Sequence, residues 1–294
     1  EFIENYLVDL TGDDYNSIVE LLKKIHFEEL LTKALINADQ WERAYSAYFL
    51  GLMRCHRAEG MLHRLVYDSS PIVSIIAFES LNRIGSRKDL YNIITFVLRN
   101  STISISKVFD IILNYGDAVN QELIGILSDP NVSENGKRLV LDVIAARNVA
   151  ESLPAVKELA YRTQNQEIII GCIKALSAFG GPESLDFLMA HLSSSNWVIR
   201  SQAVRALGNI SSPMIIPELK IRIRTDSNNW VRLSSAQAVK KFGPLGDREL
   251  KSILSLYPKE EVAAVVKYGI YESEVRSLML DIVLTLIRTF NSDE

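Results

Sequence analysis

Residue types that support catalysis or metal binding are few in this chain. Its 294 residues include four histidines and two cysteines, and the densest group is Cys55, His56 and His63. These side chains could meet as metal ligands, but a helix interrupted by Gly60 supplies no fourth ligand of the kind that a zinc site needs. The sequence also contains no glycine-rich phosphate loop, nucleophile elbow or zinc-protease motif. We therefore predict no catalytic residue, no metal site and no cofactor.

Composition narrows the class of protein further. With 48% apolar and 23% charged residues, the chain is typical of a folded, soluble protein. Its net charge of -4 argues against a nucleic-acid partner, because such binding depends on Lys and Arg contacts to phosphate. No apolar run reaches the roughly 18 residues that span a bilayer. Two cysteines far apart in sequence favour a reducing compartment, hence the cytoplasm. Because the chain opens at Glu1 rather than methionine, we expect a fragment, so an upstream signal or anchor stays open.

Any functional residue must be positioned by the predicted helices, and these helices recur along the sequence as a repeat. One helical phrase recurs at intervals of 31 to 33 residues, and it is clearest in residues 197–210 and 230–243. A period in this range predicts a solenoid, in which each unit buries its apolar face by stacking on its neighbours. We number each phrase from a position zero, which falls at Glu42, Val73, Ser104, Lys137, Ile168, Ile199 and Val231.

Each phrase has the pattern of an amphipathic helix. Positions four, seven, eight and eleven fall on one helical face, and small residues at four and seven would let neighbouring helices approach closely. A first helix precedes each phrase, with proline near several starts. Asn196 and Asn229 are predicted to cap the second helices that follow them. Glycine stands at position twelve where a left-handed residue would end the helix, at Gly85, Gly116, Gly180 and Gly243.

The pairs Ile199-Arg200 and Val231-Arg232, each followed by Ala-Val, resemble the short HEAT repeat of the phycobilisome-lyase type. The match is good at units 168, 199 and 231, fair at 42, 73 and 104, and poor at 137. The resemblance implies an all-α fold, a right-handed α-α superhelix (HEAT-like solenoid) of about eight or nine helical pairs in one continuous domain. It also implies N-terminal capping helices in 1–38, repeats in 39–256 and C-terminal capping helices in 257–294, where residues 272–290 predict one long amphipathic helix.

The resemblance assigns structural roles to two recurring residue types. In this family the arginine at position one, here Arg43 and Arg200 among others, commonly pairs with an acid in a linking loop. Asp39 and Asp226 are the candidate acids, and exposed pairs of this kind contribute little to stability. Aromatic residues near the helix starts are interpreted as packing between repeats, at Trp41, Trp197 and Trp230.

The resemblance further implies that the second helices line a concave groove, into which positions three, six and ten point. In the second half of the chain these positions hold four cations and no acid: Arg147, Lys174, Arg205 and Lys241. Such a stripe in an acidic protein can attract an acidic peptide, a polyanion or a phosphate, and its alternative is an ordinary solvated face. In the first half, Tyr45 and Tyr48 are typical of interface anchors, or else of packing against the capping helices.

These patterns favour a non-catalytic scaffold that holds a protein or peptide partner in its groove, and the cation stripe suits an acidic one. The alternative is an enzyme or enzyme subunit of a HEAT-like type, either bilin lyase-like or alkylpurine DNA glycosylase-like. Asp110 is a counterpart in role only for the glycosylase aspartate, and no residues specify a bilin pocket. No His-Glu dipeptide is present, so the HEAT-type di-iron hydroxylases are not supported.

Overall fold

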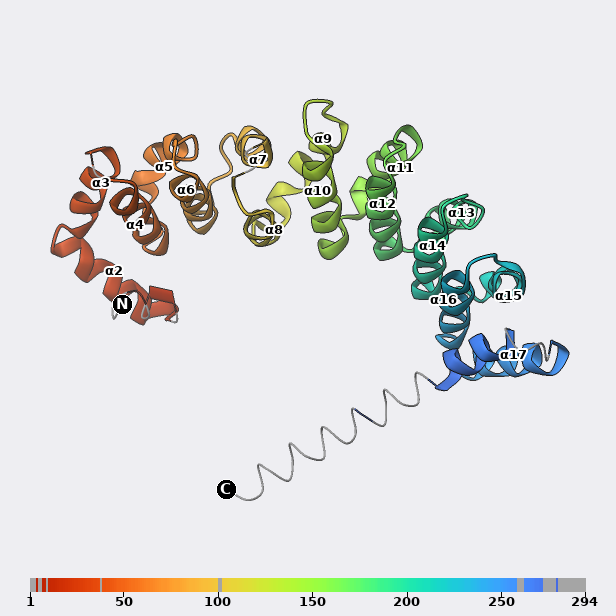
Figure 1. Ribbon diagram of the computed structural model, residues 1–294. Coiled ribbons are helices and arrows are strands. Elements are labelled where there is room, and N and C mark those ends of the chain that lie inside the picture. Colours follow the sequence, from red (N-terminus) through yellow and green to blue (C-terminus); the bar gives the residue numbers. More distant parts are fainter. Residues whose placement is uncertain are drawn as a thin grey trace, which may run out of the picture. The chain divides into compact units, whose positions relative to one another are not determined.

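The computed structural model describes residues 4, 7, 8, 10–37, 39–99, 102–257, 262–271 and 279. These residues form helices joined by turns, and none of them is in a strand. The chain divides into two compact units, Glu1–Ala155 and Val156–Glu294, which we call unit 1 and unit 2. The all-α, HEAT-like solenoid predicted from the sequence is confirmed, since each unit is a stack of helical pairs (Figure 1).

Unit 1 arranges its helices in two layers. In Figure 1 the first helices α5, α7 and α9 lie in one layer, and the second helices α4, α6, α8 and α10 lie in the other. Short 3-10 turns precede several first helices. The helices are α2 (Gly12–Lys24), α3 (Phe27–Asn37), α4 (Gln40–Leu52), α5 (Glu59–Leu65), α6 (Pro71–Ile84), α7 (Leu90–Arg99), α8 (Ile105–Leu113), α9 (Asn120–Ser128) and α10 (Glu134–Arg147).

Unit 2 repeats the same plan after α11 (Leu153–Arg162), which crosses the boundary between the units. Helices α12, α14 and α16 pack side by side as second helices, and α13 and α15 cover them. The helices are α12 (Gln166–Phe179), α13 (Gly181–His191), α14 (Trp197–Ile210), α15 (Ile216–Thr225), α16 (Asn229–Lys240) and α17 (Pro244–Leu256). A further helix covers 262–271. Pairs from α3–α4 to α17 and this last helix match the eight or nine that we predicted.

Capping side chains explain where the second helices begin. Asn196 accepts a hydrogen bond of 2.8 Å from the Val198 amide, so this predicted N-cap is confirmed. The predicted cap at Asn229 is wrong by one residue. Asn228 has the extended backbone of a cap and accepts from the Trp230 amide at 2.9 Å, whereas Asn229 is already helical.

Left-handed residues explain where several second helices end. Gly85 has φ 80° and ψ 24°, as its place at position twelve predicts. In the unit at Lys137, where the phrase is poorest, Asn148 takes the left-handed conformation at φ 54° and α10 still ends there. Asparagine tolerates this conformation better than most residues, so a weak phrase keeps a regular helix end.

Small residues allow the second helices to approach one another closely. Gly208 at position nine of α14 faces Ala238 at position seven of α16, and a Cβ on Gly208 would lie 2.8 Å from the Ala238 Cβ. The same relationship joins Gly51 of α4 to Ser80 of α6. Position eight forms the core, since it is fully buried at Leu50, Leu81, Ile112, Leu176, Leu207 and Val239.

The period continues beyond the last phrase that we recognised in the sequence. Val262 lies 31 residues after Val231, and Val266 at position four is fully buried. Gly269 at position seven approaches α16, where a Cβ would lie 2.9 Å from the Ala236 Cβ. The 262–271 helix is therefore another second helix. The helix predicted over 272–290 lies outside the described residues, apart from Met279.

Candidate partner-binding surface

Four of the six candidate residues have exposed side chains. Tyr45 lies on α4 in unit 1, and Lys174, Arg205 and Lys241 belong to successive second helices of unit 2. Arg147 and Tyr48 make structural contacts instead, as described below. The three unit 2 cations are thus exposed on or directly after successive second helices, whereas Tyr45, Tyr48 and Arg147 belong to unit 1.

Hydrogen bonds between helices define one face of unit 2. Asn209 of α14 accepts from Lys241 Nζ at 2.5 Å and donates to Ser177 Oγ of α12 at 3.4 Å. Arg205 Nε donates to Ser234 Oγ of α16 at 3.4 Å. Positions three, six and ten therefore lie beside one another across three helices. We call this surface the second-helix face of unit 2, and it consists of Lys174, Gln202, Arg205, Asn209, Gln237 and Lys241.

The charge of the second-helix face is positive. Neither α14 nor α16 contains Asp or Glu. Among the residues that the structure describes, Arg205 and Lys241 have neutral hydrogen-bond partners and no carboxylate within ion-pair distance. Five other unit 2 cations are paired with acids, in Arg162–Glu158, Arg200–Asp226, Lys220–Glu249, Arg222–Glu218 and Lys240–Asp247. Arg205 and Lys241 thus carry positive charge that no acid of α14 or α16 compensates.

Arg147 differs from the other three cations because its guanidinium is engaged within unit 1. Its side chain is only 10% exposed and pairs with Asp117 at 3.0 Å. It also donates to the Leu113 carbonyl, at 3.3 Å, where α8 ends. These contacts tie α10 to α8 and its following turn, which gives Arg147 a structural role.

The two candidate tyrosines of α4 lie in different environments. Tyr45 is 52% exposed, and its ring lies 4.7 Å from that of Phe49. Tyr48 is half-buried, with the Arg83 guanidinium 5.1 Å from its ring centroid. Burial raises the pKa of Tyr48, and a hydrogen bond with Glu4 adds to the effect. Tyr48 therefore packs against the N-terminal residues and α6, while Tyr45 presents its ring to solvent.

Two arginines at position one, Arg43 and Arg200, act as clamps between repeats. Arg200 pairs with Asp226 as predicted, but the pair is buried rather than exposed, at 9% and 5%. Arg43 pairs with Asp68 at 2.9 Å instead of with Asp39, because the Asp39 carboxylate caps α4 by accepting from the Trp41 and Glu42 amides. Burial alone would raise the pKa of Asp226, but hydrogen bonds from Arg200 and the Asn228 amide hold it below its usual value.

The tryptophans near the helix starts are more exposed than packing between repeats requires. Trp41 is 62% exposed, Trp230 is 59% and Trp197 is 42%. More than half of the Trp41 and Trp230 side chains is thus open to solvent, which packing between repeats did not predict. Neighbouring helices do not enclose these large side chains near the helix starts. The repeat period of the sequence therefore did not predict how far the tryptophans are buried.

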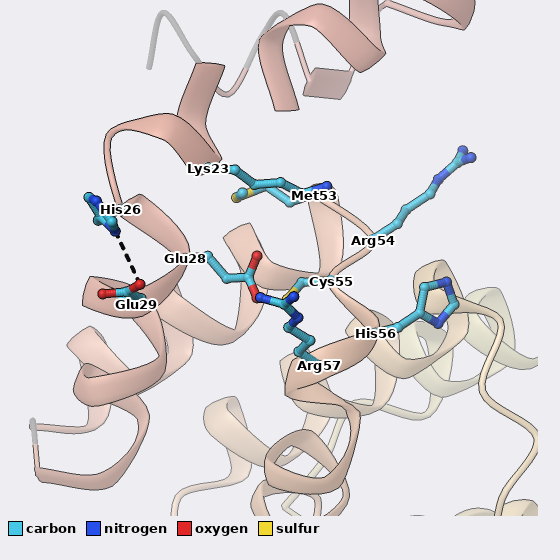
Figure 2. A pocket seen from close by; sticks show the side chains of 9 residues that line it. All are labelled: Lys23, His26, Glu28, Glu29, Met53, Arg54, Cys55, His56 and Arg57. Carbon is cyan, nitrogen blue, oxygen red and sulfur yellow. Dashed lines mark hydrogen bonds and ion pairs between the residues drawn. The ribbon is translucent and has the colours of Figure 1, made fainter. Parts of the chain in front are cut away.

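A cavity of about 330 Å³ lies at the junction of α2, α3 and α4 in unit 1 (Figure 2). Glu28 accepts a hydrogen bond from the Cys55 thiol, and burial raises the pKa of that thiol to about 11. Glu29 lies 3.1 Å from His26 Nδ1. These contacts join α3 to its two neighbouring turns, and a thiol that stays protonated is a poor nucleophile.

Neither a metal cluster nor a membrane span is found in the described part of the chain. No three His, Cys, Asp or Glu side chains there are grouped to hold a metal ion. No helix there combines the length and apolar character that crossing a bilayer requires.

Sequence reasoning missed one exposed residue that borders the second-helix face of unit 2. Tyr268 occupies position six of the 262–271 helix and is 56% exposed, in the same row as Lys174, Arg205 and Gln237. The signal was present in the step of 31 residues from Val231 to Val262, but the phrase there lacks the position-one arginine that four of the seven recognised units carry.

Comparisons with known proteins give weak structural likenesses and one family match. Human deoxyhypusine hydroxylase is 19% identical, with 93% of this chain and 95% of that chain covered and a TM-score of 0.35. The complex of CpcE and CpcF of phycocyanin lyase from Nostoc is 16% identical (78% and 94% covered, TM-score 0.35). The E. coli protein YibA is 16% identical (88% and 97% covered, TM-score 0.46). No curated protein matches the sequence. The model of HEAT repeats matches residues 120–201 and 185–273.

Proposed function

This chain belongs to the HEAT-repeat family, and we propose that it is a non-catalytic scaffold whose second-helix face in unit 2 binds an extended acidic segment of a partner protein. One observation carries the proposal. Arg205 and Lys241 are exposed cations whose hydrogen-bond partners are neutral, and neither α14 nor α16 contains an acid. Lys174 extends the same row onto α12.

The spacing of the cations suits an extended segment. Packed helices lie about 8–10 Å apart, and an extended chain advances about 3.3 Å per residue. Acidic side chains about three residues apart would therefore meet cations on successive helices. Gln202 and Asn209 lie on the same face, and their amides can bond to the backbone of such a segment.

A protein partner fits this surface better than a nucleic acid does. The chain carries a net charge of -4, and the face contributes a few cations rather than a broad basic surface. Duplex DNA binding draws its affinity from many simultaneous phosphate contacts. A short acidic segment needs only the two or three cations that this face provides.

The test is a fluorescence-anisotropy titration with a labelled polyglutamate peptide at low salt. The variant Arg205→Glu/Lys241→Glu should weaken binding about tenfold or more, and added salt should weaken wild-type binding. Arg248→Glu/Lys251→Glu on α17 makes the same change in net charge on the other layer and should bind like wild type. Equal losses in both variants, or tighter binding of duplex DNA than of polyglutamate, would overturn the proposal.

A further inference from the structure

Two exposed aromatic side chains border the second-helix face of unit 2. Trp230 is 59% exposed and precedes Ser234 by four residues and Lys241 by eleven, so it lies on the same side of α16. Tyr268 is 56% exposed at position six of the 262–271 helix. That helix packs directly on α16, since a Cβ on Gly269 would lie 2.9 Å from the Ala236 Cβ.

The side chains at position six change from cationic to aromatic along unit 2. They run from Lys174 and Arg205 through Gln237 to Tyr268, so cations on α12 and α14 give way to an amide and then an aromatic ring. Lys241 stands between the two ends, hydrogen-bonded to Asn209 of α14. The face therefore has a charged end and an aromatic end.

We propose that the acidic segment bound by this face also carries one aromatic or long aliphatic side chain, which seats against Trp230 and Tyr268 at the aromatic end. This inference rests on the proposed function. Exposed Trp and Tyr side chains offer large apolar area at small entropic cost, and they are enriched among residues that dominate binding energy. An anchor there adds apolar burial to ion pairs that water and salt would otherwise weaken.

The geometry sets the spacing within the bound segment. Arg205 and Tyr268 lie on helices separated by two packing steps, which corresponds to about 20 Å. An extended chain covers that distance in about six residues. The expected motif is an acidic cluster followed or preceded, at about six residues, by the apolar anchor.

Aromatic and cationic side chains together can also bind single-stranded nucleic acid by stacking. The observations favour a peptide, because the face carries one arginine among its cations and the chain is acidic overall. A single-stranded RNA oligonucleotide therefore serves as the competing ligand in the test.

The experiment compares two labelled peptides, polyglutamate and the same peptide with a tryptophan about six residues from the acidic cluster. The anchor should tighten wild-type binding about tenfold or more. Trp230→Ala and Tyr268→Ala should each reduce that gain while leaving the affinity for plain polyglutamate unchanged. Tyr161→Ala, at a 72% exposed tyrosine of α11, should keep the full gain. Thermal unfolding of each variant verifies folding, and Tyr268→Ala alone decides the matter if Trp230→Ala does not fold.

The outcomes separate this inference from the proposed function. If Arg205→Glu/Lys241→Glu leaves polyglutamate binding intact, the proposed function fails and this inference fails with it. If that variant loses polyglutamate binding but the anchor gives no gain, or its gain survives both alanine variants, only the inference fails. Displacement of the anchored peptide by single-stranded RNA at matched concentration would also overturn it.

Discussion

Arg200 and Asp226 lie 26 residues apart and meet through two hydrogen bonds of 2.8 Å each, from Nε to Oδ2 and from Nη2 to Oδ1. The third guanidinium nitrogen donates to the Ser194 and Ser195 carbonyls. Asp226 also accepts from the Asn228 amide at 2.9 Å. One arginine thus joins the loop before its own helix to the loop before the next second helix. Arg43 and Asp68 form the same pair of hydrogen bonds in unit 1, where Asp68 also accepts from the Ser70 amide.

Removing one partner of this clamp should destabilise unit 2 strongly. Asp226→Ala leaves a buried guanidinium without its carboxylate, which costs about 3–5 kcal/mol of unfolding free energy. Arg162→Ala is the matched control, because Arg162 pairs with Glu158 at a 78% exposed site. That change should cost less than about 1 kcal/mol. Urea unfolding measures both, and similar losses in the two variants would show that burial of the clamp does not matter.

The clamps also predict how stability depends on pH. In the folded chain, burial would raise the pKa of both Asp68 and Asp226, but hydrogen bonds from their arginines and from backbone amides lower it overall. Their contribution is therefore complete above the unfolded pKa of about 3.9 and is lost as pH falls through the folded pKa. Unfolding free energies measured between about pH 6 and pH 3 should fall less steeply in Asp68→Asn/Asp226→Asn than in wild type. An unchanged slope would contradict this assignment.

Replacing glycine by alanine should destabilise the protein at Gly208, where two second helices approach closely, but not at Gly60, where the added methyl group has space. Gly208→Ala places a methyl group 2.8 Å from the Ala238 Cβ and 3.0 Å from its Cα. Such overpacking against backbone costs about 1–3 kcal/mol. Gly60→Ala on α5 meets no atom within 4 Å and should be neutral or stabilise by up to about 1 kcal/mol, because alanine favours helix. Thermal unfolding compares the two, and a neutral Gly208→Ala would refute the packing argument.

Two alanine variants should distinguish the structural role of Arg147 from the binding role of Arg205. Arg147→Ala removes charged hydrogen bonds to Asp117 and the Leu113 carbonyl, which should cost about 2 kcal/mol of stability without changing peptide affinity. Arg205→Ala removes an exposed side chain and should change stability by less than about 0.5 kcal/mol while weakening polyglutamate binding. The prediction fails if both residues affect the same property.

Regular features of the fold were predictable from the sequence because they follow from helix periodicity. Position eight had to face the core, and residues such as Leu207 and Val239 are fully buried there. The Arg200–Asp226 pair followed from the family pattern, but its burial did not, since fractional exposure depends on how loops close over a side chain. The shift of the cap from Asn229 to Asn228 reflects the same limit, because either asparagine satisfies the pattern.

The candidate surface was only partly predictable. The repeat period placed Lys174 and Arg205 at position six and Lys241 at position ten, and it placed Arg147 at position ten too. What distinguishes Arg147 is an acid in a turn thirty residues away, Asp117, and no spacing rule identifies such a partner. The exposure of Trp230 was not predicted, because an aromatic residue repeated near helix starts suits packing as well as exposure. Contacts in three dimensions were needed to separate these roles.

The most direct test of the account is where a bound acidic peptide touches the protein. A photo-crosslinking amino acid placed at Gln202, three residues before Arg205 on α14, should capture labelled polyglutamate at low salt. The same probe at Lys251, on the opposite layer, should capture little, and Arg205→Glu/Lys241→Glu should abolish capture at Gln202. Equal capture at the two sites, or capture at Gln202 that survives the charge reversal, would contradict the claim that the second-helix face of unit 2 is the binding surface.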